Sequence, residues 1–341
     1  MASSALRDAV HRLVRRESLS ADATAAAFRE VMAGEGSAAL VGALLAALRV
    51  KGETADELAG AARALREAMV SLPCDDPASL VDTCGTGGGS LATFNISTAA
   101  ALVVAGAGVR VAKHGNRSFT TRSGSADVLE ALGVAIDIPA DRMPSVLEQA
   151  GIVFMFAPTM HPAMRHVGPV RRELGIESVM NMLGPLANPA HAGRQVVGVG
   201  NIDRAELMAG ALAALGSVHS LVVHGEPGMD EVSPVGTTSV IEVKDGVLSR
   251  WTIEPASLGF GPLDAGELAG ASPEENAAVI EAVLAGTGPE CAQAAVALNA
   301  AAALFVAGKS PTLAGGLEVA RESIASGAAA GALERLKRAT R

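Results

Sequence analysis

A glycine-rich segment near residue 85 carries the residue types that bind phosphate groups. It reads Asp82-Thr83-Cys84-Gly85-Thr86-Gly87-Gly88-Gly89-Ser90, and Thr93, Asn95, Ser97 and Thr98 follow at the start of a predicted helix. Glycine lets a backbone approach a ligand without a Cβ clash, and the unpaired N–H groups at a helix start attract anions. Ser97 and Thr98 also fit as helix N-caps, and the two roles are compatible. The segment is predicted to be a phosphate-binding loop.

Two known glycine motifs do not fit this loop. A Walker loop ends in Gly-Lys followed by Ser or Thr, whereas Gly89-Ser90 is followed by Leu91. A dinucleotide-binding loop has a third glycine at a fixed offset and an acid after the next strand, whereas this chain has Ser90 and Lys113. Four glycines within residues 85–89, between a predicted strand and a helix, also argue against a turn that is glycine-rich only for packing.

A second polar segment follows the next predicted strand and carries three cations. It reads Lys113-His114-Gly115-Asn116-Arg117-Ser118 and continues with Thr120, Thr121, Arg122, Ser123, Gly124 and Ser125. The carboxyl ends of parallel strands meet at one edge of a sheet, so this basic segment and the glycine loop are predicted to be neighbours. The cations and hydroxyl groups at that edge favour phosphate binding over a solvated turn with a Ser cap.

Two further positions are ambiguous from residue type alone. Asp230 and Glu231 follow a predicted strand, and Mg²⁺ is commonly bound by one or two carboxylates together with substrate phosphates. An Asp-Glu pair in a loop with glycine and proline is, however, usually a solvated turn. Arg171 offers a planar donor fork that suits a carboxylate, but it stands in a run with Arg165 and Arg172 that also fits a helix surface.

The pattern of apolar residues places these segments in an α/β fold. Residues 1–72 have helical periodicity and are predicted to form a small domain of four helices, which helices around 162–185 are expected to join. In residues 73–341, short apolar runs alternate with helical stretches, which predicts a mostly parallel sheet covered by helices. The predicted strands are 79–83, 109–112, 152–156, 195–199 and 220–223, and Asp245-Gly246 predicts a hairpin.

The composition is that of a folded protein with a large core. Hydrophobic residues make up 49% of the 341 residues, which excludes a disordered chain. The formal net charge of −9 and the lack of a basic run argue against broad nucleic-acid binding. The N-terminus has no apolar signal core, and the best apolar stretch, 96–109, is too short to span a bilayer. Three widely spaced cysteines fit a reducing compartment, so we expect a cytoplasmic protein with no membrane partner.

Several longer motifs, in one order along nearly the whole chain, resemble the signature blocks of the anthranilate phosphoribosyltransferase family. They are Gly-Thr-Gly-Gly at 85–88, Thr93-Phe94-Asn95-Ile96-Ser97-Thr98-Ala99, Lys113-His114-Gly115-Asn116-Arg117, Ser123-Gly124-Ser125-Ala126-Asp127, Ala157-Pro158, His161-Pro162-Ala163-Met164, Val170-Arg171-Arg172-Glu173-Leu174-Gly175, Leu183-Gly184-Pro185-Leu186-Ala187-Asn188-Pro189 and Asp230-Glu231. The resemblance implies a fold like that of type III nucleoside phosphorylases: a small helical domain, usually the dimer contact, packed on a large α/β domain that binds 5-phosphoribosyl diphosphate (PRPP). It implies transfer of the 5-phosphoribosyl group to the amine of anthranilate, with release of diphosphate, in tryptophan biosynthesis.

The resemblance also assigns roles to residues. PRPP would be held by Gly85, Gly88, Gly89, Thr93, Asn95, Ile96, Ser97, Thr98, Lys113, His114, Gly115, Asn116, Arg117, Ser118, Phe119, Thr120, Thr121 and Ser125. Anthranilate would contact Gly85, His114, Asn116, Pro158, His161 and Arg171, and one or two Mg²⁺ ions would be bound through Ser97, Asp230 and Glu231. No covalent nucleophile is expected, because the amine attacks C1 of the ribose through an oxocarbenium-like transition state that needs positioning and charge neutralisation.

Two departures from the family pattern bear on substrate affinity. Gly89 stands where the family usually has Asp, and Glu177-Ser178-Val179-Met180-Asn181 replaces a more usual Arg-Thr-Ile-Phe-Asn. We expect a catalytic protein with altered substrate affinity.

Two other functions are compatible with this fold. A pyrimidine-nucleoside phosphorylase would need a different basic motif at 113–117, and a nucleic-acid-binding relative would need a basic surface and an eroded site. The acidic chain retains the motif, so no nucleic-acid partner is expected. A separate glutaminase or anthranilate synthase subunit stays open as a partner.

Overall fold

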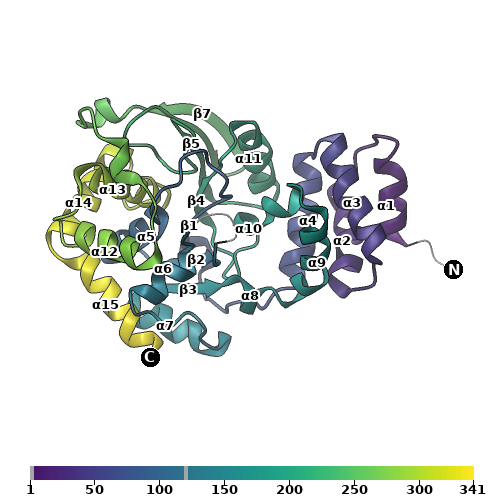
Figure 1. Cartoon of the computed structure of the whole chain (residues 1–341), viewed down its shortest axis with the longest axis horizontal. Helices are drawn as coiled ribbons and strands as arrows, with labels where there is room; N and C mark the ends of the chain where they lie inside the picture. The colour runs from purple at the N-terminus through teal and green to yellow at the C-terminus, as the bar shows by residue number, and fades with distance from the viewer. Residues whose placement is uncertain (1–3, 119–121) are drawn as a thin grey trace.

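The computed structural model describes residues 4–118 and 122–341, with an α-helical part beside an α/β part (Figure 1). The helical part begins with α1 (Ala5–Leu13), α2 (Ala21–Ala33), α3 (Ala38–Lys51) and α4 (Ala55–Glu67). Each helix starts where a hydroxyl side chain accepts a hydrogen bond from an N–H group of the first turn; these caps are Ser4, Ser20, Ser37 and Thr54. The sequence therefore marks each of these helix starts with a capping residue.

A seven-stranded sheet forms the centre of the α/β part. Its strands are β1 (Val81–Gly85), β2 (Val111–Gly115), β3 (Ile152–Phe156), β4 (Arg194–Gly198), β5 (His219–Gly225), β6 (Thr238–Lys244) and β7 (Val247–Ile253). The order is β3-β2-β1-β4-β5-β6-β7, parallel from β3 to β5 and antiparallel from β5 to β7. The mostly parallel sheet confirms the predicted fold class. The β6–β7 hairpin turns at Asp245-Gly246, both with positive φ, as that dipeptide predicts.

Helices cover both faces of the sheet. One group is α5 (Ile96–Gly106), α6 (Ser125–Ala131), α7 (Met143–Ala150), α12 (Pro273–Leu284), α13 (Glu290–Val306), α14 (Leu313–Ala325) and α15 (Ala328–Thr340). In Figure 1, α12 to α15 lie on the side of the sheet away from the helical part, and α11 (Ala205–Ala214) lies on the side nearer to it. Three short helices, α8 (Ala157–Met160), α9 (Gly168–Leu174) and α10 (Leu183–Leu186), connect β3 to β4. Of these, α9 and α10 bury side chains in the same hydrophobic cluster as α1 to α4.

The helical part and one face of the sheet share a single hydrophobic cluster. It includes Leu44 and Leu58 from the helical part, Met208 from α11, and Val197 and Val222 from the sheet. Strand residues that alternate to the opposite face belong to a second cluster, packed against α5 and α13. The helical part is therefore joined to the sheet by a continuous core. Within the described residues, no helix is long and apolar enough to cross a membrane.

The first two strands lie further along the chain than the sequence predicts. Each begins two residues later than expected, so that Asp82, Lys113 and His114 fall within strands rather than near or beyond their ends. Polar residues fit there because the sheet satisfies them: Asp82 accepts hydrogen bonds from the Asn188 side chain at 2.8 Å and from the His114 N–H at 3.2 Å. Part of each binding motif is thus held on a strand.

Candidate active site

The strand order reverses at β1, since β2 and β3 lie on one side of it and β4 and β5 on the other. In open α/β sheets, ligands bind in the crevice at the carboxyl ends of the strands beside such a reversal. The glycine loop leaves β1 at this point, and the connections after β4 and β5 emerge at the same edge of the sheet. The fold therefore places the predicted phosphate loop where a ligand is expected.

The glycine loop needs glycine at several positions for backbone reasons. Gly87 and Gly88 have φ of 69° and 80°, a conformation that other residues rarely adopt. Gly200, just after β4, approaches so closely that a Cβ there would lie 2.5 Å from the Gly89 nitrogen. The Gly200 N–H also donates to Thr86 Oγ1 at 3.3 Å. The loop is thus held by direct backbone packing against the β4–α11 connection.

Two carboxylates from the loop after β5 contact the glycine loop and the start of α5. The Gly87 N–H donates to Asp230 Oδ2 at 3.0 Å, and the Ser97 N–H donates to Glu231 Oε1 at 3.2 Å. Burial raises the pKa of Asp230, and burial together with the neighbouring Asp230 raises the pKa of Glu231 to about 8. A divalent cation would favour the charged form of both carboxylates.

The donors at this place fit Mg²⁺ only together with a phosphate-bearing ligand. In the parts of the chain that the structure describes, no group of three or more His, Cys, Asp or Glu side chains could hold a metal ion. Asp230, Glu231 and the Ser97 hydroxyl are oxygen donors, which Mg²⁺ prefers, and Mg²⁺ usually completes such a set with phosphate oxygens and water. Magnesium binding here would therefore depend on the substrate.

Lys113 brings a positive charge to the start of α5. Its side chain is buried, and the ammonium donates to the Thr83 carbonyl and, at 3.3 Å, to Ser97 Oγ. Burial lowers the pKa of Lys113, while Asp82 acts in the opposite direction. The neighbouring Thr98 Oγ1 is buried and finds no hydrogen-bond partner among the described residues. This hydroxyl is therefore available to a phosphate oxygen.

Two described residues of the basic segment, Asn116 and Arg117, contact α6. Arg117 Nη1 donates to Asp127 Oδ1 at 2.8 Å and to Glu130 Oε2 at 2.5 Å, and these partners raise the pKa of Arg117. The Ser125 hydroxyl donates to the Asn116 carbonyl at 3.3 Å. In this arrangement Arg117 faces α6, and its contact with PRPP stays a prediction. Three of the predicted PRPP contacts, Phe119, Thr120 and Thr121, lie outside the described residues.

Asn95, the residue before α5, links the start of this helix to two other segments. Its side-chain amide donates to the Ser123 carbonyl at 3.2 Å, and its Oδ1 accepts from Ser123 Oγ at 3.1 Å and from Asn276 Nδ2 at 3.0 Å. Asn276, near the start of α12, is not among the site residues that the sequence predicts. The only signal that the sequence offers is an Asn that stands among the apolar positions of that helix.

Asn299 is a second residue that sequence reasoning misses. It lies in the middle of α13, is buried, and its Oδ1 accepts from the Val232 N–H at 2.9 Å. Its Nδ2 donates to the Val232 and Ala295 carbonyls, both at 2.9 Å. Because Val232 follows Glu231 directly, Asn299 fixes the backbone that carries the two carboxylates. Only the tertiary fold brings the middle of α13 to this loop.

Two histidines form a neutral aromatic pair near the carboxyl end of β2. His114 Nδ1 lies 3.1 Å from the Gly184 carbonyl, which can only accept, so Nδ1 carries a proton and Nε2 accepts from His161 Nε2 at 3.1 Å. Burial lowers the pKa of His114 to about 3 and that of His161 to about 4. Both rings are therefore uncharged at neutral pH.

Arg171 lies on α9, half-buried, and no carboxylate of the described residues pairs with it. Burial lowers the pKa of Arg171, which reflects the incomplete hydration of its guanidinium. A half-buried guanidinium without an acidic partner suits a ligand carboxylate. Pro158, another predicted anthranilate contact, is exposed at the start of α8, directly after β3.

Known proteins resemble the chain over nearly its whole length. Residues 77–330 match the a/b domain of a glycosyl transferase family, and residues 7–69 match the helical bundle domain of such a family. The anthranilate phosphoribosyltransferase of Geobacillus kaustophilus is 47% identical, with 97% of each chain covered. That of Roseiflexus sp. is 49% identical, again with 97% of each chain covered. The chain belongs to the anthranilate phosphoribosyltransferase family.

Solved members of the anthranilate phosphoribosyltransferase family share the fold of the chain. The enzyme from Thermus thermophilus is 44% identical, covers 98% of this chain and 99% of its own, and gives a TM-score of 0.92. The Saccharomyces cerevisiae enzyme, in complex with PRPP and Mg, is 29% identical and gives a TM-score of 0.89 over 98% of this chain and 97% of its own.

The two departures from the pattern of the anthranilate phosphoribosyltransferase family have different surroundings. A Cβ at Gly89 would lie 2.8 Å from the Gly228 carbonyl oxygen, so the loop before Asp230 closely approaches the space of the usual Asp side chain. Glu177 is exposed and lies 3.7 Å from Arg49 of α3, a surface ion pair of small energetic weight. Gly89 therefore bears on the phosphate loop, whereas Glu177 contacts the helical part.

Proposed function

We propose that this member of the family transfers the 5-phosphoribosyl group of PRPP to the amine of anthranilate and releases diphosphate, a step of tryptophan biosynthesis. The observation that carries the proposal is the meeting of the glycine loop, the start of α5 and the two carboxylates Asp230 and Glu231 at the strand-order reversal. This set provides N–H donors for a diphosphate and oxygen ligands for its metal ion.

The residues of the glycine loop and of α5 bind and orient PRPP. In this structure the N–H groups of Gly87 and Ser97 donate to Asp230 and Glu231, so the two carboxylates lie directly against the glycine loop and the start of α5. Lys113 adds a positive charge next to Ser97. Bound Mg²⁺, held by Asp230, Glu231 and Ser97, supplies charge neutralisation for the leaving diphosphate. A metal titration would show whether one or two Mg²⁺ ions bind.

The aromatic substrate is held by residues at the end of β2 and after β3. Arg171 pairs with the carboxylate of anthranilate, and the uncharged rings of His114 and His161 line the place of its ring. The aryl amine is only weakly basic, so the two neutral histidines need not act as strong bases. The protein contributes mainly by holding the amine in line with C1 of the ribose.

Ligands bound to related proteins support this assignment. The enzyme from Saccharomyces cerevisiae is known in complex with PRPP and Mg, and also in complex with 4-fluoroanthranilate, in structures 29% and 28% identical to this chain. We carry these two ligand types over to this chain as part of the proposal.

We further propose a homodimer formed through the helical part, and a cytoplasmic location. Val14, directly after α1, and Val50 of α3 are large apolar side chains exposed on the helical part, which suits a contact with a second copy. Cys74, Cys84 and Cys291 are free thiols, as is usual in a reducing compartment.

Anthranilate fluorescence tests the proposed activity. The protein is mixed with anthranilate and PRPP, with and without Mg²⁺, and the fluorescence is followed over time. We expect a decay that requires both PRPP and Mg²⁺. A flat trace from folded protein with verified substrates would contradict the proposal, and cleavage of a pyrimidine nucleoside by phosphate in the same preparation would support the phosphorylase function instead.

A further inference from the structure

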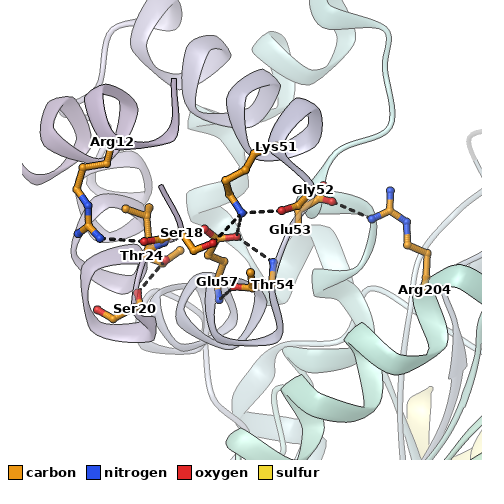
Figure 2. A network of polar contacts seen from close by, with 11 residues as sticks. Arg12, Ser18, Ser20, Thr24, Lys51, Gly52, Glu53, Thr54, Glu57 and Arg204 are labelled. Carbon is orange, nitrogen blue, oxygen red and sulfur yellow. Dashed lines mark hydrogen bonds and ion pairs between the residues drawn. The ribbon is translucent and has the colours of Figure 1, made fainter. Parts of the chain in front are cut away.

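A buried ion pair joins the helical part to the connection after β4. Glu53 lies between α3 and α4, and its side chain is 1% exposed; Arg204 ends the short 3-10 turn before α11, and its side chain is 18% exposed. Arg204 Nη1 donates to Glu53 Oε2 at 2.8 Å across 151 positions of the sequence. Figure 2 shows Arg204 pointing from the α/β part toward Glu53.

The Glu53 end of this pair is held rigidly. Lys51 donates to Glu57 Oε2 at 2.9 Å and to the Gly52 carbonyl at 2.6 Å, and the Thr54 N–H donates to the same Glu57 oxygen at 2.9 Å (Figure 2). Thr54 and Glu57 form the capping box of α4. These contacts fix the backbone on both sides of Glu53, so its carboxylate is presented from a stiff connection.

Stability alone is a weak explanation for the pair. Glu53 Oε1 is buried and finds no hydrogen-bond partner among the described residues, and burial raises the pKa of Glu53. A buried carboxylate with half of its hydrogen-bonding capacity unused is unfavourable, and apolar side chains of similar size often stabilise such a place as well or better. The pair is better explained by the position in which it holds the β4–α11 connection relative to the helical part.

The Arg204 end leads directly to the glycine loop. Arg204 is four residues beyond Gly200, whose backbone packs on Gly87 to Gly89 and whose N–H donates to Thr86 Oγ1. The connection that supports the phosphate loop is therefore joined to the helical part by a polar contact, the ion pair of Arg204, next to the apolar packing of α11 against α4. Displacing this connection would move the surface on which the glycine loop rests.

We propose that Glu53 and Arg204 are a positioning pair that fixes the β4–α11 connection, and with it the glycine loop, against the helical part. The inference rests on the proposed function, because the loop is taken to bind PRPP. Neither residue is expected to touch a substrate. The pair should therefore affect PRPP affinity more than the rate of the chemical step.

The test is the double variant E53L/R204M, which replaces the ion pair by apolar side chains. We expect its unfolding free energy to equal or exceed that of the natural protein, its KM for PRPP to rise about tenfold, and its kcat and KM for anthranilate to change less than threefold. Hydrogen exchange of the amides at 86–90 should quicken. The conservative variant R204K should keep the KM for PRPP within about threefold of the natural value.

The matched control is E206L/R250M, because Glu206 is also on α11 and forms a bidentate ion pair, but with Arg250 of β7 and on the surface. This control should leave the KM for PRPP and the exchange at 86–90 unchanged. If the double variant does not fold, the single variant E53Q, which keeps the shape of the side chain, is measured in the same assays.

A natural KM and natural exchange rates in folded E53L/R204M, or equal changes in the control, would overturn the inference. Failure of the natural protein to consume anthranilate would instead count against the proposed function, and the exchange measurement would still decide whether the pair holds the loop.

Discussion

At the residue scale, Arg171 is the group most directly matched to an aromatic acid. It is half-buried on α9, and the described residues offer it no carboxylate. The adjacent Arg172 is exposed on the same helix and carries the same charge. Variants of the two arginines can therefore distinguish the effect of a guanidinium at the proposed binding position from the effect of net charge.

Replacing Arg171 by Gln should weaken anthranilate binding specifically. The loss of a partly desolvated charge pair is expected to raise the KM for anthranilate by roughly 30-fold or more, with the KM for PRPP changed less than threefold. Steady-state kinetics measure both constants, and R172Q is the control. Equal effects of R171Q and R172Q on the KM for anthranilate would argue against the assigned role.

Gly89 is one of the two places at which the sequence is expected to depart from the family's pattern. Asp at this position would place a Cβ 2.8 Å from the Gly228 carbonyl and a third carboxylate beside Asp230. We expect G89D to raise the KM for PRPP by a factor of roughly five, equivalent to about 1 kcal/mol. G89A adds the Cβ alone and separates the steric effect from that of charge. A lower KM in G89D would mean that the natural chain is impaired at this position.

At the element scale, α13 supports the loop of the two carboxylates through one side chain. Asn299 satisfies both backbone groups of Val232, the residue after Glu231. The N299L variant leaves those groups buried without partners, so we expect a loss of about 2–4 kcal/mol of unfolding free energy. We also expect a several-fold higher Mg²⁺ concentration for the half-maximal rate.

Urea unfolding and a Mg²⁺ titration of the rate measure these two effects of N299L. The control is S323A, which removes a buried hydrogen bond from α14 to the Val103 carbonyl, far along the chain from the carboxylates. S323A should lose about 1 kcal/mol with an unchanged Mg²⁺ requirement. An unchanged Mg²⁺ requirement in N299L as well would show that Asn299 is only structural.

The sequence predicts elements better than it predicts their supporting contacts. Caps such as Thr54 and the turn at Asp245-Gly246 are local signals, so the helix starts and the hairpin follow from them. The first two strands begin two residues later than predicted, and the burial of Asp82 within β1 depends on a hydrogen bond from Asn188, which is far away along the chain. Partners far apart in the chain, Asn299 among them, carry no local signal of their role.

The same difference between local signals and distant contacts applies to the residues of the candidate site. The glycine loop can be identified from its composition, and its position at the same sheet edge as the basic segment follows from the parallel pairing of β1 and β2, whereas its place beside β4 is visible only in the fold. The ion pairs of Arg117 with Asp127 and Glu130 cannot be read from residue types, since exposed charges on neighbouring elements have many possible partners. The pair Glu53–Arg204 is likewise visible only when the helical part is placed against the α/β part.

At the scale of the whole molecule, the neutral pair His114–His161 links stability to pH. The unfolded chain binds protons at both histidines below a pH of about 6.5, whereas the folded chain does so only near the lowered pKa values of about 4 and about 3. The unfolding free energy should therefore fall as the pH falls below 6.5, by about 2 kcal/mol per histidine at pH 5 relative to pH 8.

Urea unfolding of the natural protein and of H161Q, at pH 5, 6 and 8, measures this link. H161Q removes one titrating group and should show a correspondingly shallower loss of stability toward pH 5. The exposed His11 of α1 provides the control variant H11Q, which should keep the natural pH dependence. Identical slopes for the natural protein and H161Q would contradict the neutral pair.

A shared hydrophobic core joins the helical part to the sheet that carries the site, so the test of the proposed reaction concerns the whole chain. The most direct test counts the anthranilate consumed and the diphosphate released in one reaction with PRPP, with and without Mg²⁺. We expect one diphosphate to be released for each anthranilate consumed, and neither change to occur without Mg²⁺. Diphosphate released without loss of anthranilate, or no turnover from folded protein, would contradict the proposed reaction.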